Sequence, residues 1–370
     1  MWIHDHPNWT QFIWDIEALS SNLANIRYRQ GRLFGRMENL GFGLQQEAQL
    51  KMLTDDVLSS SAIEGEKLNP IEVRSSIARR LRLDIADMVP ITRHVDGVVE
   101  MMLDATQHYA QSLTAERLYD WHAALFPTGR SGMHKITVGH WRTPESGSMQ
   151  VISGAMGKEK THYEAPTATR LDHEMGIFLA WCESDQNIDP VLKAGIAHFW
   201  FVTIHPFEDG NGRIARAIGD MFLARADGSP ERFYSLSRQI EIDRNSYYTT
   251  LENQQRNSSD ITIWLDWFLS CLDRSLTYSE KALSSIVFKS RLWDALNIGG
   301  VNERQRFIIN RMLDEEFEGF ISTSRYAKMA KCSNDTALRD IKELQSRGVF
   351  LQNAGGGRST SYRLTDTIPS

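Results

Sequence analysis

The sequence predicts a mainly α-helical protein that contains one β-hairpin and ends in a small domain of three helices and a second hairpin. Apolar residues recur at three- and four-residue steps over most of the 370 residues, which is the helical period. Strand-like alternation is confined to residues 138–154 and to the C-terminal end. Hydrophobic residues make up 41% of the chain, so it can bury a core.

Composition excludes several classes of protein. The 41 basic and 47 acidic side chains give a net charge of −6, which argues against a surface built to coat nucleic acid or anionic membrane. Cys182, Cys271 and Cys332 lie too far apart for a disulfide framework or a zinc site. The N-terminus has no signal-peptide pattern, and no run of 18 apolar residues occurs. We therefore expect a cytoplasmic protein without a membrane partner.

Residues 1–88 are predicted to form an N-terminal helical cap. The spacing of apolar residues predicts an amphipathic helix over residues 8–37 and, after a glycine break, a second helix over residues 44–62. Gly65 and the Asn69-Pro70 pair mark its end. Glu64 should therefore lie near a helix end.

Residues 89–290 are predicted to form the central domain, and residues 300–370 the C-terminal one. Asp189 should cap an apolar helix that stops at His205, because Pro206 disfavours the helical conformation before it. The hairpin is expected over residues 138–154, with its tip at residues 145–148. The other expected helices are 90–126 (two helices), 169–184, 213–225, 243–256, 260–290, 303–314, 322–331 and 333–347. The last three helices and the hairpin after them form a winged-helix pattern.

The most informative stretch of the chain is residues 205–216, HPFEDGNGRIAR. Gly210 and Gly212 permit positive φ, so backbone N–H groups can turn inward and form an anion nest at the start of a helix. Arg213 and Arg216 add two permanent positive charges, which favours a polyphosphate. Asp209 can hold Mg²⁺ beside the phosphates.

Other motifs fit poorly. The spacing of acidic residues excludes an EF-hand, and the sequence contains no GxxxxGK[ST], GxGxxG or HExxH. The remaining alternative is a plain helix–helix turn with solvated arginines.

Residues 205–216 resemble the Fic motif HxFx(D/E)(G/A)N(G/K)RxxR at every defining position. The resemblance implies a Fic-type helical core with a β-hairpin flap, an N-terminal helical cap and a C-terminal winged helix. It also implies transfer of AMP from ATP, with Mg²⁺, to a Ser, Thr or Tyr hydroxyl of a protein, including the chain itself. Pyrophosphate is the second product.

The resemblance assigns a role to each motif residue. His205 is the general base, Asp209 binds Mg²⁺, and Arg216 receives the γ-phosphate. The remaining implied contacts to the nucleotide come from the motif, from the flap and from the helix expected beside adenine: Gly210, Asn211, Gly212 and Arg213; Val151, Ile152, Ser153 and Gly154; Tyr247 and Tyr248. A plain surface hairpin and a core role for either tyrosine remain open.

Residues 60–65 resemble the inhibitory motif (S/T)xxxE(G/N) of the same family, with Ser60 and Glu64 at the matching positions. An i,i+4 pair lies on one helical face, so both side chains address the same neighbour. The implied neighbour is Arg216, whose pairing with Glu64 would prevent productive ATP binding. A solvated helix-end glutamate is the alternative.

Two functions stay open at this stage. One is an autoinhibited AMP transferase, whose site could also remove AMP. The other is a DNA-binding regulator whose Fic domain senses nucleotide, since residues 301–370 carry a net charge of +2 and Arg339, Lys342, Arg347 and Arg358 could reach phosphates. The sequence also leaves open whether the chain is a monomer or a homodimer.

Overall fold

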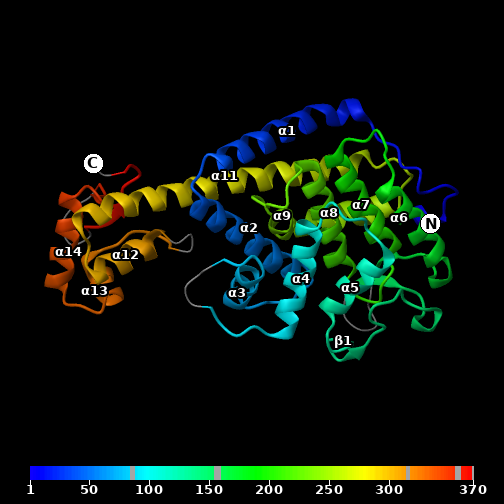
Figure 1. Ribbon diagram of the computed structural model, residues 1–370, viewed down its shortest axis with the longest axis horizontal. Coiled ribbons are helices and arrows are strands. Elements are labelled where there is room, and N and C mark those ends of the chain that lie inside the picture. The colour runs from blue at the N-terminus through cyan, green and yellow to red at the C-terminus, as the bar shows by residue number, and fades with distance from the viewer. Residues whose placement is uncertain (84–87, 154–159, 314–316, 355–359, 369–370) are drawn as a thin grey trace. The chain divides into compact units, whose positions relative to one another are not determined.

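The computed structural model describes residues 1–83, 88–153, 160–313, 317–354 and 360–368 (Figure 1). The chain separates into two compact units, Met1–Glu280 and Lys281–Ser370. Within the described ranges, no helix is both long enough and apolar enough to cross a membrane.

The larger unit is helical, with short strands between α5 and α6. Its helices are α1 (Ile16–Glu38), α2 (Phe42–Ile63), α3 (Pro70–Arg80), α4 (Arg93–Gln107), α5 (Ala115–Leu125), α6 (Leu171–Glu183), α7 (Pro190–Ile204), α8 (Asn211–Asp227), α9 (Leu236–Ile242), α10 (Arg244–Gln255) and the first part of α11 (Thr262–Gly299). Its strands are β1 (Arg130–Ser131), β2 (His134–Lys135), β3 (Gln150–Ser153) and β4 (Lys160–Glu164).

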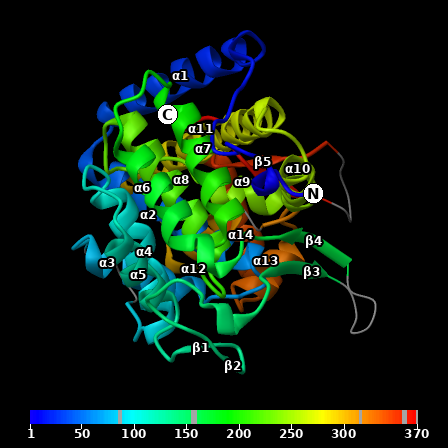
Figure 2. The ribbon, with the colours of Figure 1, turned by 90° about the vertical axis from the view of Figure 1, so that its right-hand side faces the viewer.

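Helices α7 and α8 pack against each other at the centre of this unit (Figure 2). The α7 prediction is confirmed at both ends. Asp189 caps the helix by accepting a hydrogen bond from the Val191 N–H at 2.8 Å, and the helix ends at His205. Nearly every residue of α7 is buried, which is why its sequence is apolar on all faces.

Helix α1 runs alongside α11, and polar pairs join the two (Figure 1). Asn22 donates to Asp266 at 3.0 Å and Asn25 donates to Asp273 at 2.9 Å. The predicted start of α1 at residue 8 is wrong. The helix begins after Asp15, which caps it, and the preceding segment instead packs Phe12 against Trp200 at a ring distance of 5.3 Å.

The hairpin is displaced along the chain from its predicted position. Strand β3 pairs with β4 in an antiparallel register, and the predicted tip residues 145–148 lie before β3. Pro144 cannot donate to a strand ladder and Gly147 has φ of +75°, so this stretch forms a short 3₁₀ turn (Pro144–Ser146) instead. Gly154, the last predicted flap residue, lies outside the described residues.

Two helices of the larger unit escaped prediction. Asn69-Pro70 marks the start of α3: the Asn69 side chain accepts from the Ile71 N–H at 2.9 Å, and Pro70 is the first helical residue. The short helix α9 is capped by Ser235, which accepts from the Arg238 N–H at 3.0 Å. Proline at the first helical position is favoured because its missing N–H would lack a partner there.

After the last part of α11, the smaller unit contains three helices and a hairpin in the predicted order. These are α12 (Glu303–Leu313), α13 (Thr323–Met329), α14 (Asn334–Ser346), β5 (Phe350–Gln352) and β6 (Tyr362–Leu364). Its core includes Ile308, Ile341 and Leu344, all fully buried. Arg358, one of the predicted phosphate contacts, lies outside the described residues. The winged-helix assignment stays a prediction.

Candidate functional site

His205 lies at the C-terminal end of α7 in a left-handed conformation, with φ of +53°. Its Nδ1 is 3.1 Å from the carbonyl oxygen of Val202. A carbonyl can only accept, so Nδ1 carries the proton and Nε2 is left as an acceptor. Burial lowers the pKa of His205. A neutral imidazole with a free Nε2 has the form that a general base requires.

The loop after His205 is held from inside by Phe207 and Asn211. Phe207 is fully buried and stacks on the His122 ring at 4.2 Å. Asn211 closes the loop with two hydrogen bonds: its Oδ1 accepts from the Phe207 N–H at 2.9 Å, and its Nδ2 donates to the Phe207 carbonyl at 2.8 Å. Gly210 has φ of +81°, and a Cβ there would lie 2.9 Å from the Phe126 ring. Both the conformation and the space therefore require glycine.

Two neighbouring carboxylates border this loop. Asp209 accepts hydrogen bonds from the Ser131 hydroxyl and from the Gly210 N–H. Glu208 accepts from the Ser146 hydroxyl at 2.6 Å. Burial raises the pKa of Glu208, but hydrogen bonds to its carboxylate, led by that from Ser146, outweigh burial and hold it below its usual range. Within the described part of the chain, no group of three or more His, Cys, Asp or Glu side chains could hold a metal. A metal at Asp209 would therefore need oxygen ligands from a bound substrate.

Arg216 of α8 is held by the end of α2. Its side chain is 1% exposed; Nε donates to the Ser60 hydroxyl at 2.9 Å and Nη2 to the Ser60 carbonyl at 2.7 Å. The same Nη2 lies 2.9 Å from Glu64 Oε1. Gly212 faces this pair, and a Cβ there would collide with the Glu64 carboxylate. Ser60, Glu64 and Arg216, predicted from separate segments, therefore meet.

Arg213 has an acidic partner that the sequence reasoning missed. Its Nη1 donates to Glu66 Oε2 at 2.7 Å, and its guanidinium lies 5.1 Å from the centre of the Phe126 ring. Glu66 is held from its other side by His94, at 3.2 Å. Two residues after Glu64, a second carboxylate thus pairs with the second arginine of the loop. The sequence shows a second glutamate in Glu64-Gly65-Glu66, but no neighbouring residue indicates that Glu66 would pair with Arg213.

A cavity of about 530 Å³ lies over the loop. One wall comes from residues 208–212, and the other walls come from the hairpin and α10. The predicted site residues that line it are Glu64, Val151, Ile152, Ser153, His205, Asp209, Gly210, Asn211, Gly212, Tyr247 and Tyr248. Ser60, Arg213 and Arg216 lie outside its lining.

The two tyrosines of α10 differ in their surroundings. Tyr247 is 1% exposed, and its hydroxyl lies 2.9 Å from His198 Nε2, which places most of this side chain in the core. Tyr248 is 38% exposed, so part of its ring is accessible to a ligand. Tyr248 is therefore the better candidate for stacking on a base.

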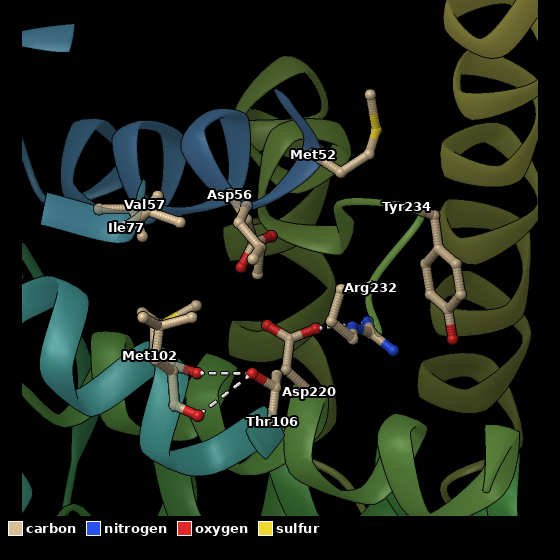
Figure 3. Close-up of a pocket in the computed structure, with 11 residues that line it drawn as sticks. Met52, Asp56, Val57, Ile77, Met102, Thr106, Asp220, Arg232 and Tyr234 are labelled. Carbon is tan, nitrogen blue, oxygen red and sulfur yellow. Dashed lines mark hydrogen bonds and ion pairs between the residues drawn. The ribbon is translucent and has the colours of Figure 1, made fainter. Parts of the chain in front are cut away.

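A buried polar cluster links α2 to α8 through residues 232–235 (Figure 3). Arg232 donates to Asp220 of α8 at 2.8 Å, and Asp56 of α2 accepts from the Ser235 hydroxyl at 2.6 Å. Burial, reinforced by the nearby Asp56 carboxylate, raises the pKa of Asp220 well above its usual value. The cavity here is about 10 Å³, too small for a ligand. Asp220 lies one turn after Arg216, so the cluster also fixes the register that brings Glu64 to Arg216.

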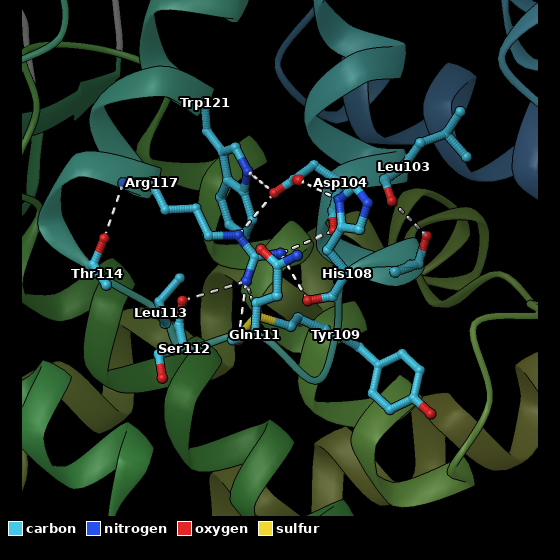
Figure 4. Close-up of polar contacts among 12 residues, drawn as sticks. Leu103, Asp104, His108, Tyr109, Gln111, Ser112, Leu113, Thr114, Arg117 and Trp121 are labelled. Atoms are coloured by element: carbon cyan, nitrogen blue, oxygen red, sulfur yellow. Dashed lines mark hydrogen bonds and ion pairs between the residues drawn. The ribbon is translucent and has the colours of Figure 1, made fainter.

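A larger groove of about 950 Å³ over α4 and α5 is less suited to catalysis. Its central charged groups bind one another (Figure 4). Arg117 Nε donates to Asp104 at 2.8 Å, and the Trp121 indole donates to the same oxygen at 2.7 Å. These contacts join α4 to α5 and have a structural role.

The chain is similar to known families in two segments. Residues 2–83 match a family described as a domain of unknown function, DUF4172, and residues 112–223 match the Fic/DOC family.

Curated relatives match the chain over longer stretches. A protein adenylyltransferase Fic from Culex quinquefasciatus is 25% identical over 270 residues, which cover 72% of this chain and 49% of the relative. One from Nematostella vectensis is 30% identical over 226 residues, covering 60% and 47%. The chain thus spans about half the length of the curated relatives it matches.

Two solved structures share the fold. A Fic family protein from Desulfovibrio desulfuricans G20 aligns with a TM-score of 0.50 and 20% identity over 94% of this chain and 96% of that one. A Fic domain containing signaling protein from Bacteroides thetaiotaomicron aligns with a TM-score of 0.52 and 20% identity, over 71% and 98%. At this identity the likeness concerns the fold alone.

Proposed function

We propose that the chain transfers AMP from ATP to a hydroxyl side chain of a protein, with release of pyrophosphate, because residues 112–223 match the Fic/DOC family. The observation that carries the proposal is a partly buried His205, whose Nδ1 faces the Val202 carbonyl, beside a glycine loop in one cavity. The names of the curated relatives support the same reaction.

In the proposed reaction His205 Nε2 takes the proton of the incoming hydroxyl while its oxygen attacks the α-phosphate. The Nδ1–H bond to Val202 keeps the imidazole in the required tautomer. The N–H groups of residues 210–212 at the start of α8 would bind the phosphates, since a helix N-terminus attracts anions. Asp209 would hold Mg²⁺ together with phosphate oxygens, and the bound ion would neutralise phosphate charge.

Autoinhibition is part of the proposal. The ion pair between Glu64 and Arg216 supports it, because a guanidinium held by a carboxylate is not available to a γ-phosphate. The pair between Glu66 and Arg213 extends the same effect to the second arginine. ATP would need to displace or rotate both carboxylates before its phosphates reach these side chains.

The remaining walls of the cavity suit the rest of the substrate. We propose that Tyr248 contacts adenine and that Val151, Ile152 and Ser153 of β3 line the nucleotide. Among the described residues β3 pairs with β4 alone, so its other edge could accept a target segment as an added strand. A Ser, Thr or Tyr of that segment would then be presented to His205.

No specific observation favours the DNA-binding alternative. Arg347, one of its candidate phosphate contacts, donates to the carbonyl oxygens of Gly300 and Leu296, the latter at 3.1 Å. This arginine is therefore engaged within the smaller unit. Removal of AMP by the same site, a homodimer and a cytoplasmic location stay predictions.

The function is tested by incubating the protein and its Glu64→Gly variant with labelled ATP and Mg²⁺, alone and with a cell lysate. We expect AMP to become covalently attached to protein, more in the variant, and pyrophosphate to be released in equal amount. Release of phosphate or ADP in place of pyrophosphate would contradict the proposed reaction.

A further inference from the structure

Ser153 of the hairpin is the first member of a chain of hydrogen bonds that ends on α10. Its hydroxyl lies 2.6 Å from His162 Nε2, and His162 Nδ1 lies 2.6 Å from Glu252 Oε2. The three residues come from β3, β4 and α10, so only the folded chain brings them together. A hydroxyl, an imidazole and a carboxylate in this order form the arrangement that activates a serine nucleophile.

The protons of this Ser153–His162–Glu252 relay can be assigned from its two ends. Burial raises the pKa of Glu252, but hydrogen bonds from His162 and Lys160 outweigh burial and hold it below its usual range. An ionised carboxylate only accepts, so His162 Nδ1 carries a proton and donates it to Glu252. In the neutral ring, Nε2 then accepts the proton of the Ser153 hydroxyl.

The relay is rigid on one side and open on the other. Lys160 lies 3.3 Å and Arg256 lies 3.4 Å from the second oxygen of Glu252, and Arg256 also donates to the carbonyl of His162 at 3.3 Å. The carboxylate and the imidazole are therefore fixed. Ser153 by contrast is exposed.

Ser153, His162 and Glu252 all line the 530 Å³ cavity that also contains His205 and residues 209–212. A nucleotide whose phosphates bind at that loop would share the cavity with the Ser153 hydroxyl. Ser148 of the same segment illustrates the ordinary case, since its hydroxyl donates to Glu164 at 2.7 Å.

We propose that Ser153 is a self-modification site of this protein, which accepts AMP from the ATP bound in its own cavity, with His162 as the base. This inference rests on the proposed function. The Ser153 oxygen forms a bond to the α-phosphorus as the bond between that phosphorus and the bridging oxygen to the β-phosphate breaks. The proton passes to His162 Nε2, Glu252 stabilises the resulting imidazolium, and pyrophosphate leaves with the bonding electron pair.

Modification of Ser153 would affect later rounds of nucleotide binding. AMP on Ser153 would occupy part of the cavity in which the next ATP must bind. Ser153 would thereby limit the number of turnovers of an uninhibited protein. The chemical class of the acceptor is a serine hydroxyl of the chain itself, distinct from the hydroxyl of a target presented to His205.

The test uses the full-length protein carrying Glu64→Gly, incubated with ATP and Mg²⁺ and digested for peptide mass spectrometry. We expect the mass of one AMP on the peptide that contains Ser153. Ser153→Ala should abolish that signal, Ser153→Thr should retain part of it, and the matched control Ser148→Ala should leave it unchanged. His162→Gln should slow incorporation at Ser153 by about 10² or more, the usual effect of losing a general base.

A second arm separates this site from the rest of the proposed function. His205→Ala should stop transfer to lysate proteins while Ser153 still acquires AMP, because its base is His162. AMP on other residues of an active protein, with the Ser153 peptide unmodified, would overturn this inference and leave the proposed function intact. Modification of Ser153 at the wild-type rate in folded, ATP-binding His162→Gln would refute the relay. A protein that labels neither itself nor a lysate protein would instead contradict the proposed function.

Discussion

Removing the carboxylate of Glu64 should strengthen ATP binding and at the same time destabilise the protein without nucleotide. The Glu64 carboxylate binds Arg216 at 2.9 Å, and the arginine is 1% exposed. Without Glu64 the guanidinium keeps its two hydrogen bonds to Ser60, so it stays in place while losing its counter-charge. A buried, unpaired cation lowers stability, and a γ-phosphate can replace the missing charge.

The size of the effect follows from the exposure of the pair. A hydrogen bond to a charged group contributes about 1.5–3 kcal/mol when buried. The Glu64 side chain is 32% exposed, and solvent screening reduces the contribution to about 1–1.5 kcal/mol. If ATP competes directly with Glu64 for Arg216, this corresponds to roughly a 5- to 10-fold lower Kd for ATP, at 1.4 kcal/mol per tenfold change.

The assay measures two quantities on Glu64→Gln and Glu64→Gly: the Kd for ATP by calorimetry and the Tm with and without ATP. We expect a lower Tm without ATP, a larger rise in Tm on adding it and a lower Kd. Glu38→Gly, which alters an exposed glutamate at the end of α1, is the matched control and should change neither quantity. In Glu64→Gly with Arg216→Ala the gain in affinity should disappear. Wild-type Kd and Tm in both folded single variants would refute the competition between Glu64 and ATP.

Four further predictions follow from the site and its surroundings. His205→Ala should abolish AMP transfer to added proteins, whereas ATP binding, measured by calorimetry, should survive. In the wild type, burial lowers the pKa of His205, so the acid limb of the pH profile of kcat/KM should lie below the usual histidine pKa of about 6.5. Glu66→Gln should weaken its hold on Arg213 and raise ATP affinity further in the Glu64→Gly background, whereas lower affinity there would indicate that Glu66 positions the arginine for phosphate. Gly210→Ala should lower the free energy of unfolding by about 1–3 kcal/mol in urea titrations, because its φ of +81° disfavours a side chain; an unchanged midpoint would contradict the assigned conformation. Burial lowers the pKa of His198 from 6.5 to about 3, so between these two pH values the unfolded chain binds a proton that the folded chain does not. The free energy of unfolding, measured in urea titrations, should therefore decrease as the pH falls from 6.5 to about 3. The decrease should be less steep in His198→Gln.

Short-range sequence patterns determined the ends of α7 and the character of the glycine loop at the site. Asp189, Pro190 and Pro206 set the ends of α7 through capping and steric effects that act within four residues, so the sequence predicts them well. The glycine loop and its two arginines lie within one helical turn of each other, so the amino-acid order alone indicates the phosphate-binding character of this stretch. The same local reasoning failed at the hairpin, because a strand is stable only with its partner. The partner strand, β4, begins only at Lys160, and the residues near β3 do not indicate where in the sequence that partner lies.

The partners of charged residues were decided by tertiary structure alone. Ser60 and Arg216 are 156 positions apart, and the packing of α2 near α8, linked through the buried contacts of Asp56, Asp220 and Arg232, brings them together. Contacts between Glu66 and Arg213, and between His162 and Glu252, had no such resemblance to indicate them. Helical periodicity reports which face of a helix is buried, but not which helix covers it, and the free energy of an ion pair depends on that neighbour. The sequence therefore determined the reacting groups, and the packing of α2, α8, α10 and the hairpin decided which of them are paired, buried or open to a substrate.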